Sequence, residues 1–171
     1  ARKMWPVKAS GKTGKPCVIM IPHMRSWSPE DPFLYDLHVR MGEDSVESYF
    51  AMRKVEVKND KEGIARIFLN NEPYFEKGVL DQGYWPDGLY TPPCDEAMIY
   101  DIQKMKDLGF NMIRKHIKIE PQRWYYHCDR IGMLVWQDMV NGGGKMNQWY
   151  VTYLTNALLP LLRHTPDAQP L

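Results

Sequence analysis

The alternation of apolar and polar residues in the first third of the chain predicts antiparallel strands. Residues 33–40 and 50–57 alternate between the two kinds of side chain, as half-buried strands do. Residues 16–21 are a further strand candidate, and we expect residues 44–49 to form a turn that leads into the second strand. No helical periodicity is visible in residues 1–58, which are therefore predicted to be part of a β-sandwich with three or four strands.

A polar segment that ends in glycine, residues 59–63, marks the expected domain boundary. After it, residues 64–80 are predicted to form a hairpin that turns at the Asn-Asn pair 70–71. Asparagine tolerates the positive φ angles that tight hairpin turns require. The chain is therefore expected to divide into residues 1–58 and residues 59–171.

From residue 78 onward, apolar strands alternate with helical patterns. The strands are predicted at residues 78–80, 111–116 and 133–136, and the helices at residues 92–108, 120–132 and 147–162. Gly132 should end the second helix, because a left-handed residue is usually needed there. Parallel strands joined by helices end at one edge of the sheet, which is where α/β folds bind ligands.

The predicted fold class is thus a β-sandwich remnant followed by an α/β region with about three β/α units. A closed (β/α)8 barrel needs eight such strands and about 250 residues. Three parallel strands therefore do not close a barrel, and an open sheet with a free edge after the third strand would be unfavourable.

Composition excludes several classes of function. The formal net charge of +1 gives no reason to expect nucleic-acid binding, and no apolar run approaches the roughly 20 residues that span a bilayer. Three widely spaced cysteines predict neither a disulfide framework nor a metal site. Glycines 142–144 lack the Gly-Lys-Ser/Thr spacing of a phosphate-binding loop. Six tryptophans and ten tyrosines are the unusual feature, since such rings fill cores but also stack on sugars.

Three segments carry a resemblance to glycoside hydrolase family 2, the β-galactosidase, β-glucuronidase and β-mannosidase group. Residues 50–57 are similar to the last strand of that family's immunoglobulin-like sandwich. Residues 68–79 resemble the segment that leads into its catalytic barrel, and residues 109–138 contain the patterns of its second and third barrel strands. The resemblance implies that residues 1–58 are the C-terminal part of the sandwich. Residues 59–171 would then be the N-terminal part of the TIM-barrel catalytic domain, a partial (β/α)8 TIM barrel with about three β/α units.

The same resemblance implies a retaining β-glycosidase that hydrolyses O-glycosidic bonds without a cofactor or metal. That chemistry needs two carboxyl groups about 5 Å apart, and the family supplies them as glutamates. Residues 141–171 contain no glutamate, and the only Asn-Glu pair, Asn71-Glu72, lies in the predicted hairpin. We therefore expect both catalytic residues to lie beyond residue 171 and the chain alone to lack turnover. Its partners would be a β-linked carbohydrate and the remainder of the barrel.

The resemblance also implies which charged side chains would contact a sugar. Arg114 would hold the nucleophile's carboxylate, and Asp138 and Asp81 would accept hydrogen bonds from sugar hydroxyls. His116, one position earlier than in the family pattern, would bind a hydroxyl or the acid/base. The alternatives are a structural salt bridge for Arg114 and for Asp138, a solvated carboxylate for Asp81 and an ordinary polar contact for His116. Glu120 is expected only to begin a helix.

Two tryptophans complete the candidate substrate-binding set. Trp85, in the long loop after the first parallel strand, and Trp136, in the third strand, would stack on sugar faces. Core packing is the alternative for both. The sequence leaves open the sugar, the compartment and the oligomeric state. A second hypothesis also stays open, a non-catalytic carbohydrate-binding or interaction module.

Overall fold

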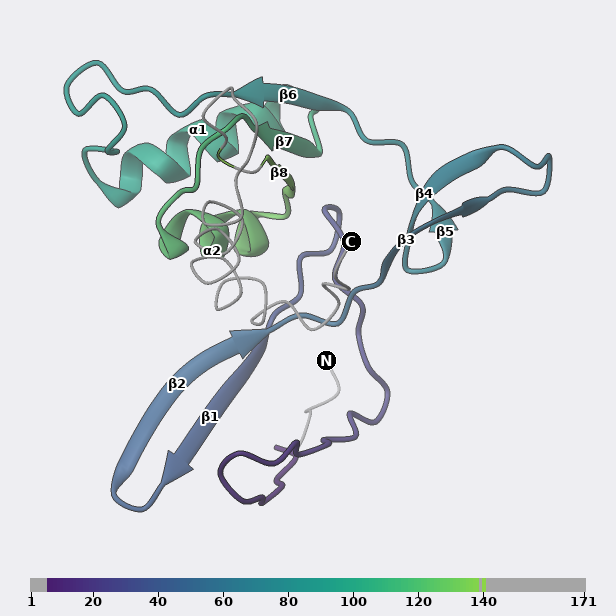
Figure 1. Ribbon diagram of the computed structural model, residues 1–171, viewed down its shortest axis with the longest axis vertical. Helices are drawn as coiled ribbons and strands as arrows, with labels where there is room; N and C mark the ends of the chain where they lie inside the picture. Colours follow the sequence, from purple (N-terminus) through teal and green to yellow (C-terminus); the bar gives the residue numbers. More distant parts are fainter. Residues whose placement is uncertain (1–5, 139, 141–171) are drawn as a thin grey trace, which may run out of the picture.

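The computed structural model describes residues 6–138 and residue 140, which form antiparallel sheets followed by parallel β/α units (Figure 1). The elements in chain order are β1 (Tyr35–Met41), β2 (Asp44–Phe50), β3 (Val55–Asn59), β4 (Ala65–Leu69), β5 (Glu72–Pro73), β6 (Gly78–Asp81), α1 (Asp95–Asp107), β7 (Met112–Lys115), α2 (Gln122–Ile131) and β8 (Leu134–Gln137). The predicted helix at 147–162 and the glycine-rich loop lie outside the described residues. Among the described residues no helix is long and apolar enough to span a membrane.

The first sheet is a hairpin of β1 and β2, and the N-terminal segments differ from two predictions. Residues 44–49, expected as a turn, lie in β2, and the chain reverses at Gly42 and Glu43 instead. Gly42 has a φ of 62°, so a two-residue turn suffices and the polar residues after it continue the ladder. Residues 16–21, expected as a strand, form none, and Val18 and Met20 are exposed.

The second sheet has the order β3-β4-β5 and is antiparallel throughout. Its turn between β4 and β5 contains Asn70 and Asn71 with φ angles of 52° and 71°, which confirms the predicted positive-φ turn. The strand expected at 50–57 is shorter at its start, since β3 begins at Val55. The expected boundary between residues 58 and 59 falls inside β3, and the division into domains stays a prediction.

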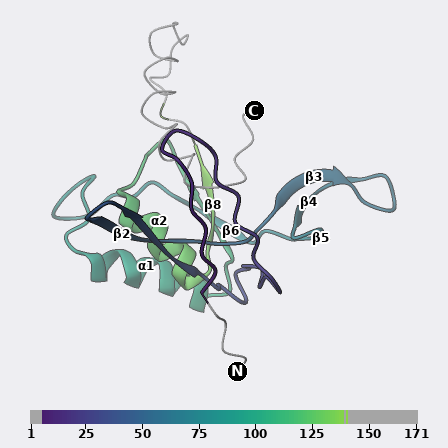
Figure 2. The ribbon, with the colours of Figure 1, turned by 90° about the horizontal axis from the view of Figure 1, so that it is seen from below.

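The third sheet is parallel, with the order β6-β7-β8, as the alternation of strands and helices predicted. Both helices pack on one face of it, and Figure 2 shows them together beside the sheet. Gly132 ends α2 with a φ of 88°, which confirms the predicted stop. The core between helices and sheet consists of Met98, Ile102, Ile113, Trp124, Cys128 and Met133.

The other face of the parallel sheet carries side chains that neither α1 nor α2 covers. Side chains alternate between the two faces along a strand. In β7, Ile113 and Lys115 therefore face the helices, and Arg114 faces the open side. The register places Leu80 beside Arg114 and Arg114 beside Trp136, all three on the open face. All three side chains are exposed. The face that holds these residues is therefore available to a ligand or to further chain.

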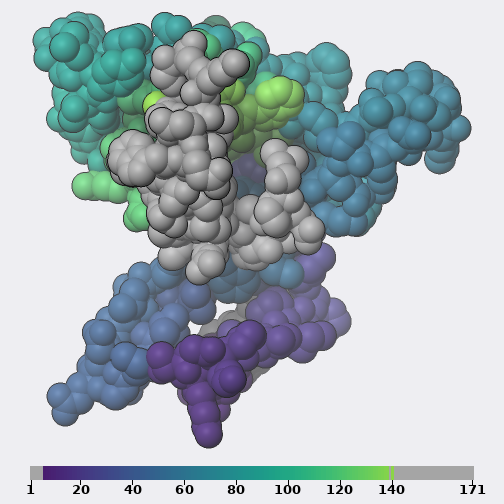
Figure 3. Space-filling model, viewed as in Figure 1, coloured from purple at the N-terminus to yellow at the C-terminus, as the bar shows by residue number. Residues whose placement is uncertain are grey.

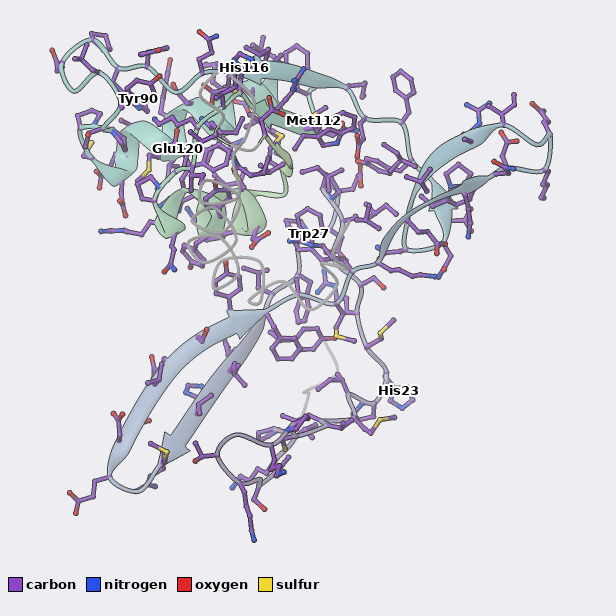
Figure 4. All side chains as sticks on the ribbon, viewed as in Figure 1. His23, Trp27, Tyr90, Met112, His116 and Glu120 are labelled. Atoms are coloured by element: carbon purple, nitrogen blue, oxygen red, sulfur yellow. The ribbon has the colours of Figure 1, made fainter. Side chains whose placement is uncertain are left out.

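Trp27 and Asp129 connect the N-terminal segments to the β/α units. Trp27 is fully buried, and its indole Nε1 donates to the backbone oxygen of Asp129 on α2 at 2.7 Å. The Asp129 carboxylate accepts from Arg53 at 2.7 Å and from the Tyr49 hydroxyl at 3.0 Å. Figure 4 shows Trp27 between the hairpin and the β/α units, and Figure 3 shows residues 6–50, purple to blue, extending beneath them. We call Trp27, Tyr49, Arg53 and Asp129 the joint.

Candidate functional site

Arg114, His116 and Asp138 lie together at the carboxyl end of the parallel strands, on the open face. The backbone N–H of His116 donates to the Asp81 oxygen at 2.9 Å, and that of Asp138 donates to the Lys115 oxygen at 3.1 Å. These bonds continue the strand ladder by one residue, so both side chains take the same face as Arg114. The sequence placed these residues at strand ends, and the structure brings the three to one edge.

Arg114 and Asp138 form a two-point ion pair. Arg114 Nε lies 3.1 Å from Asp138 Oδ1, and its Nη2 lies 3.0 Å from Oδ2. The hydrogen bonds from Arg114 lower the pKa of Asp138, and the nearby His116 lowers it further. Asp138 is therefore an ionised acceptor at neutral pH, held in a fixed orientation by the guanidinium.

His116 and Trp136 flank this ion pair. His116 Nδ1 lies 3.2 Å from Gln82 Nε2, which orients the imidazole at the end of β6. Trp136 is exposed on the open face. Burial raises the pKa of the nearby Glu76 carboxyl group, and the Trp136 side chain partly offsets this rise. The indole borders a shallow groove whose other walls include Ile67, Tyr74, Phe75, Glu76 and Met112.

Asp81 points to the opposite, helix-covered face and belongs to a buried ion network. Its Oδ2 accepts from Lys115 Nζ at 2.5 Å, and the same ammonium lies 2.9 Å from Glu120 Oε1. Lys118 Nζ lies 2.8 Å from that oxygen. The side chains of Lys115 and Glu120 are only 1% and 2% exposed, so each charge depends on the others. Asp81 is thus paired with Lys115. The predicted contact of Asp81 with a sugar stays a prediction.

Glu120 corrects a prediction, because it is more than the carboxylate that begins a helix. Helix α2 begins at Gln122, and Glu120 binds two lysines before it. The signal that could have indicated this lies in β7: Lys115 is two residues from Ile113, so it shares a buried face and needs buried counter-charges.

The ion network also fastens two loops to each other. Lys118, after β7, donates to the backbone oxygen of Gly83, after β6, at 2.7 Å. A Cβ atom on Gly83 would lie 2.5 Å from Glu120 Oε1, so only glycine fits at this contact. The loops after β6 and β7 are therefore held in fixed relation beside the candidate site.

Trp85 packs inward, whereas two tyrosines of the same loop face outward. Trp85 is half-buried against the hydrophobic core and forms backbone bonds with Leu89. This position favours core packing, and the role of Trp85 in sugar stacking stays a prediction. Tyr84 and Tyr90 are exposed, and no sequence pattern distinguishes Tyr90 from the other aromatic residues. Within residues 6–138 and 140 no group of His, Cys, Asp or Glu side chains is placed to hold a metal ion.

Residues 6–53 match the family described as Glycosyl hydrolases family 2. A β-galactosidase of Leuconostoc mesenteroides is 32% identical over 149 residues, which cover 80% of this chain and 13% of that protein. The chain belongs to glycosyl hydrolase family 2. A putative β-glucuronidase of Formosa agariphila is 30% identical over 125 residues, covering 70% of this chain and 12% of the relative. The chain thus corresponds to a small part of these family members.

Solved structures of family members contain the same fold. A β-galacturonidase of Eisenbergiella tayi, bound to galacturonate, superposes with a TM-score of 0.74 and 22% identity over 89% of this chain and 27% of that one. A β-glucuronidase of Parabacteroides merdae gives a TM-score of 0.71 and 20% identity, over 88% of this chain and 20% of the other. The antiparallel sheets and the parallel β/α units therefore form a known arrangement of this family.

Proposed function

We propose that this chain forms one wall of the sugar-binding site of a retaining β-glycosidase. Residues 1–58 would be the end of an immunoglobulin-like sandwich and residues 59–171 the first three β/α units of a TIM barrel. The observation that carries the proposal is the gathering of Arg114, His116 and Asp138 on one open face at the carboxyl ends of parallel strands. Barrel enzymes hold their active sites at that end.

The side chains of this edge are suited to binding, not to bond cleavage. Asp138 is ionised and can accept hydrogen bonds from two sugar hydroxyls, while Arg114 keeps it in place. His116 can donate or accept at a third hydroxyl, and the exposed indole of Trp136 can stack on a sugar face. In this proposal the two catalytic carboxyl groups come from chain that follows residue 171, as does the cover of the open face.

The uncovered apolar residues of that face support the need for further chain. Leu80 is 55% exposed beside Arg114 although it is an apolar residue within a strand, β6, of the described parallel sheet. The chain spans only 13% of the Leuconostoc mesenteroides β-galactosidase, so most of that relative has no counterpart here. The remainder of a barrel would bury Leu80 and its neighbours.

Two measurements on the 171-residue chain test the proposal. With 4-nitrophenyl β-glycosides we expect no turnover, because the chain would lack the catalytic pair. With methyl β-glycosides of galactose, glucuronic acid and mannose, saturation-transfer NMR should detect binding of at least one sugar. Asp138→Asn should weaken that binding about 10-fold, the value of a hydrogen bond to a charged acceptor.

The matched control is Asp107→Asn, which changes an exposed carboxylate on α1 that accepts only a Gln103 amide among the described contacts. It should leave sugar binding unchanged. Turnover by the isolated chain would contradict the absence of the catalytic pair. Equal binding by native chain and Asp138→Asn would contradict the proposed site.

A non-catalytic carbohydrate-binding module is the second candidate. It is favoured by the exposed pair Tyr84 and Tyr90, which the chain positions with its own residues. Micromolar sugar binding without turnover, in a gene that ends at residue 171, would support the module. Catalytic glutamates encoded downstream would support the glycosidase.

A further inference from the structure

We propose that Tyr84 and Tyr90 form a second sugar-binding position, which takes the neighbouring unit of a β-linked oligosaccharide. This tyrosine platform rests on the proposed function, because it lies beside the edge that carries Arg114, His116 and Asp138. It would give the site a preference for chains of two or more sugars over single sugar units.

The two rings form a built pair that faces away from the core. Their centroids lie 4.7 Å apart at an interplanar angle of 56°, and their hydroxyl oxygens lie 2.7 Å apart. Tyr84 is 59% exposed and Tyr90 53%. This exposure leaves both rings accessible to a ligand.

The loop that carries the platform is fixed by internal bonds. Trp85 N donates to Leu89 O at 2.7 Å, Leu89 N donates back at 3.0 Å, and the Trp85 ring packs on the core. At the turn, Thr91 N donates to Gly88 O at 2.9 Å, and a Cβ on Gly88 would lie 2.1 Å from the Thr91 oxygen. The rings are therefore held in position before any ligand binds, which lowers the entropic cost of binding.

Lys118 joins the platform to the strand edge. Its Nζ lies 5.3 Å from the centre of the Tyr90 ring and binds the Gly83 oxygen on the same loop. Lys118 is two residues from His116, so the platform and the candidate site are joined through one short segment. Figure 4 shows Tyr90 on the loop that continues outward from the sheet edge where His116 lies.

The chemistry of the pair suits a sugar ring. The ring faces can contact the C–H groups of a pyranose, as aromatic side chains contact other apolar surfaces. Each phenol can both donate and accept, so the two hydroxyls can bond each other and still bind sugar hydroxyls. An apolar protein partner is less well matched, because two hydroxyl groups lie within the exposed patch.

The test compares single sugars with disaccharides on the 171-residue chain. Dissociation constants are measured by calorimetry for methyl β-galactoside, methyl β-glucoside and methyl β-mannoside, and for lactose, cellobiose and β-1,4-mannobiose. We expect one disaccharide to bind about 10-fold more tightly than its single-sugar counterpart. Changing both platform residues, with Tyr84→Ala and Tyr90→Ala, should remove that gain and leave the single-sugar constant within about twofold.

Two further variants keep the test decisive if the double variant does not fold. Tyr84→Phe and Tyr90→Phe keep the rings and should retain most of the gain. Tyr100→Ala is the matched control, because Tyr100 is 63% exposed on α1 and also lies beneath a lysine, Lys104. It should change neither constant.

The outcomes separate this inference from the proposed function. If Asp138→Asn weakens sugar binding and the platform variants have no effect, the platform is overturned and the proposed sugar-binding site at Asp138 is supported. If the platform variants lose the disaccharide gain and Asp138→Asn has no effect, the platform is supported and the proposed sugar-binding role of Asp138 is contradicted. No disaccharide gain in the native chain, or an equal loss in Tyr100→Ala, would overturn the platform.

Discussion

Replacing Asp129 by alanine should destabilise the whole described fold, because this residue holds the joint together. Its carboxylate accepts from Arg53 at 2.7 Å and from the Tyr49 hydroxyl at 3.0 Å. Arg53 in turn lies over the Trp27 ring, 4.6 Å from its centre. The substitution leaves the bond from Trp27 to the backbone oxygen of residue 129 but removes both bonds to the carboxylate.

The expected loss in the free energy of unfolding is about 2–4 kcal/mol. A hydrogen bond to a charged group contributes about 1.5–3 kcal/mol, which would give about 3–6 kcal/mol for two independent bonds. The side chains of Arg53 and Asp129 remain 24% and 19% exposed, so water can partly replace the missing carboxylate. This solvation reduces the expected loss to the lower range.

Equilibrium urea unfolding, followed by Trp fluorescence and far-UV circular dichroism, measures the change. The control is Asp107→Ala, which should shift stability by less than about 0.5 kcal/mol because Asp107 is an exposed residue on α1. A double-mutant cycle with Arg53→Met should give a coupling energy of about 1–2 kcal/mol. A loss below about 0.5 kcal/mol for Asp129→Ala, or a coupling near zero, would refute the role given to the joint.

Four further substitutions test other parts of the structure. Gly83→Ala should cost about 1–3 kcal/mol in urea unfolding, since residue 83 has a φ of 67° and its new Cβ would contact Glu120; unchanged stability would contradict the packing of the ion network. Burial raises the pKa of Tyr125 to about 12 from 10.0. The folded chain therefore keeps a proton that the unfolded chain loses, stability should fall as pH rises from 10 toward 12, and Tyr125→Phe should reduce that fall. Ile113→Ala should cost about 2–4 kcal/mol and Leu80→Ala under about 1 kcal/mol, because only the first lies on the helix-covered face; equal costs would show that the open face is covered.

Local features of the fold were predictable because short segments specify them. Gly132 ends α2 and the Asn70-Asn71 pair forms its turn for reasons of backbone geometry that hold in any context. The mistaken prediction of a turn at residues 44–49 has the opposite origin. Residues 44–49 look like a turn by composition, but pairing with β1 makes them a strand, and pairing is a non-local interaction.

The face of the sheet that a side chain takes could not be predicted from its place at the end of a strand. Asp81 and Asp138 both come at the end of a strand in the sequence, and both were expected to contact a sugar. In the structure Asp81 is the last residue of its strand and Asp138 follows its strand by one position. A shift of one residue moves a side chain to the opposite face, so Asp81 meets Lys115 while Asp138 meets Arg114.

The sequence by itself determined the family, the parallel β/α units and the chemical types of residue at the candidate site, because these depend on motifs and on periodicity. Only the tertiary structure decided that Asp138 pairs with Arg114 and that Glu120 is a buried partner of two lysines. The same holds for Trp27, which binds Asp129 across 102 residues of chain. Such contacts depend on strand register and on the face each side chain takes, and both are set by the packing of the whole fold.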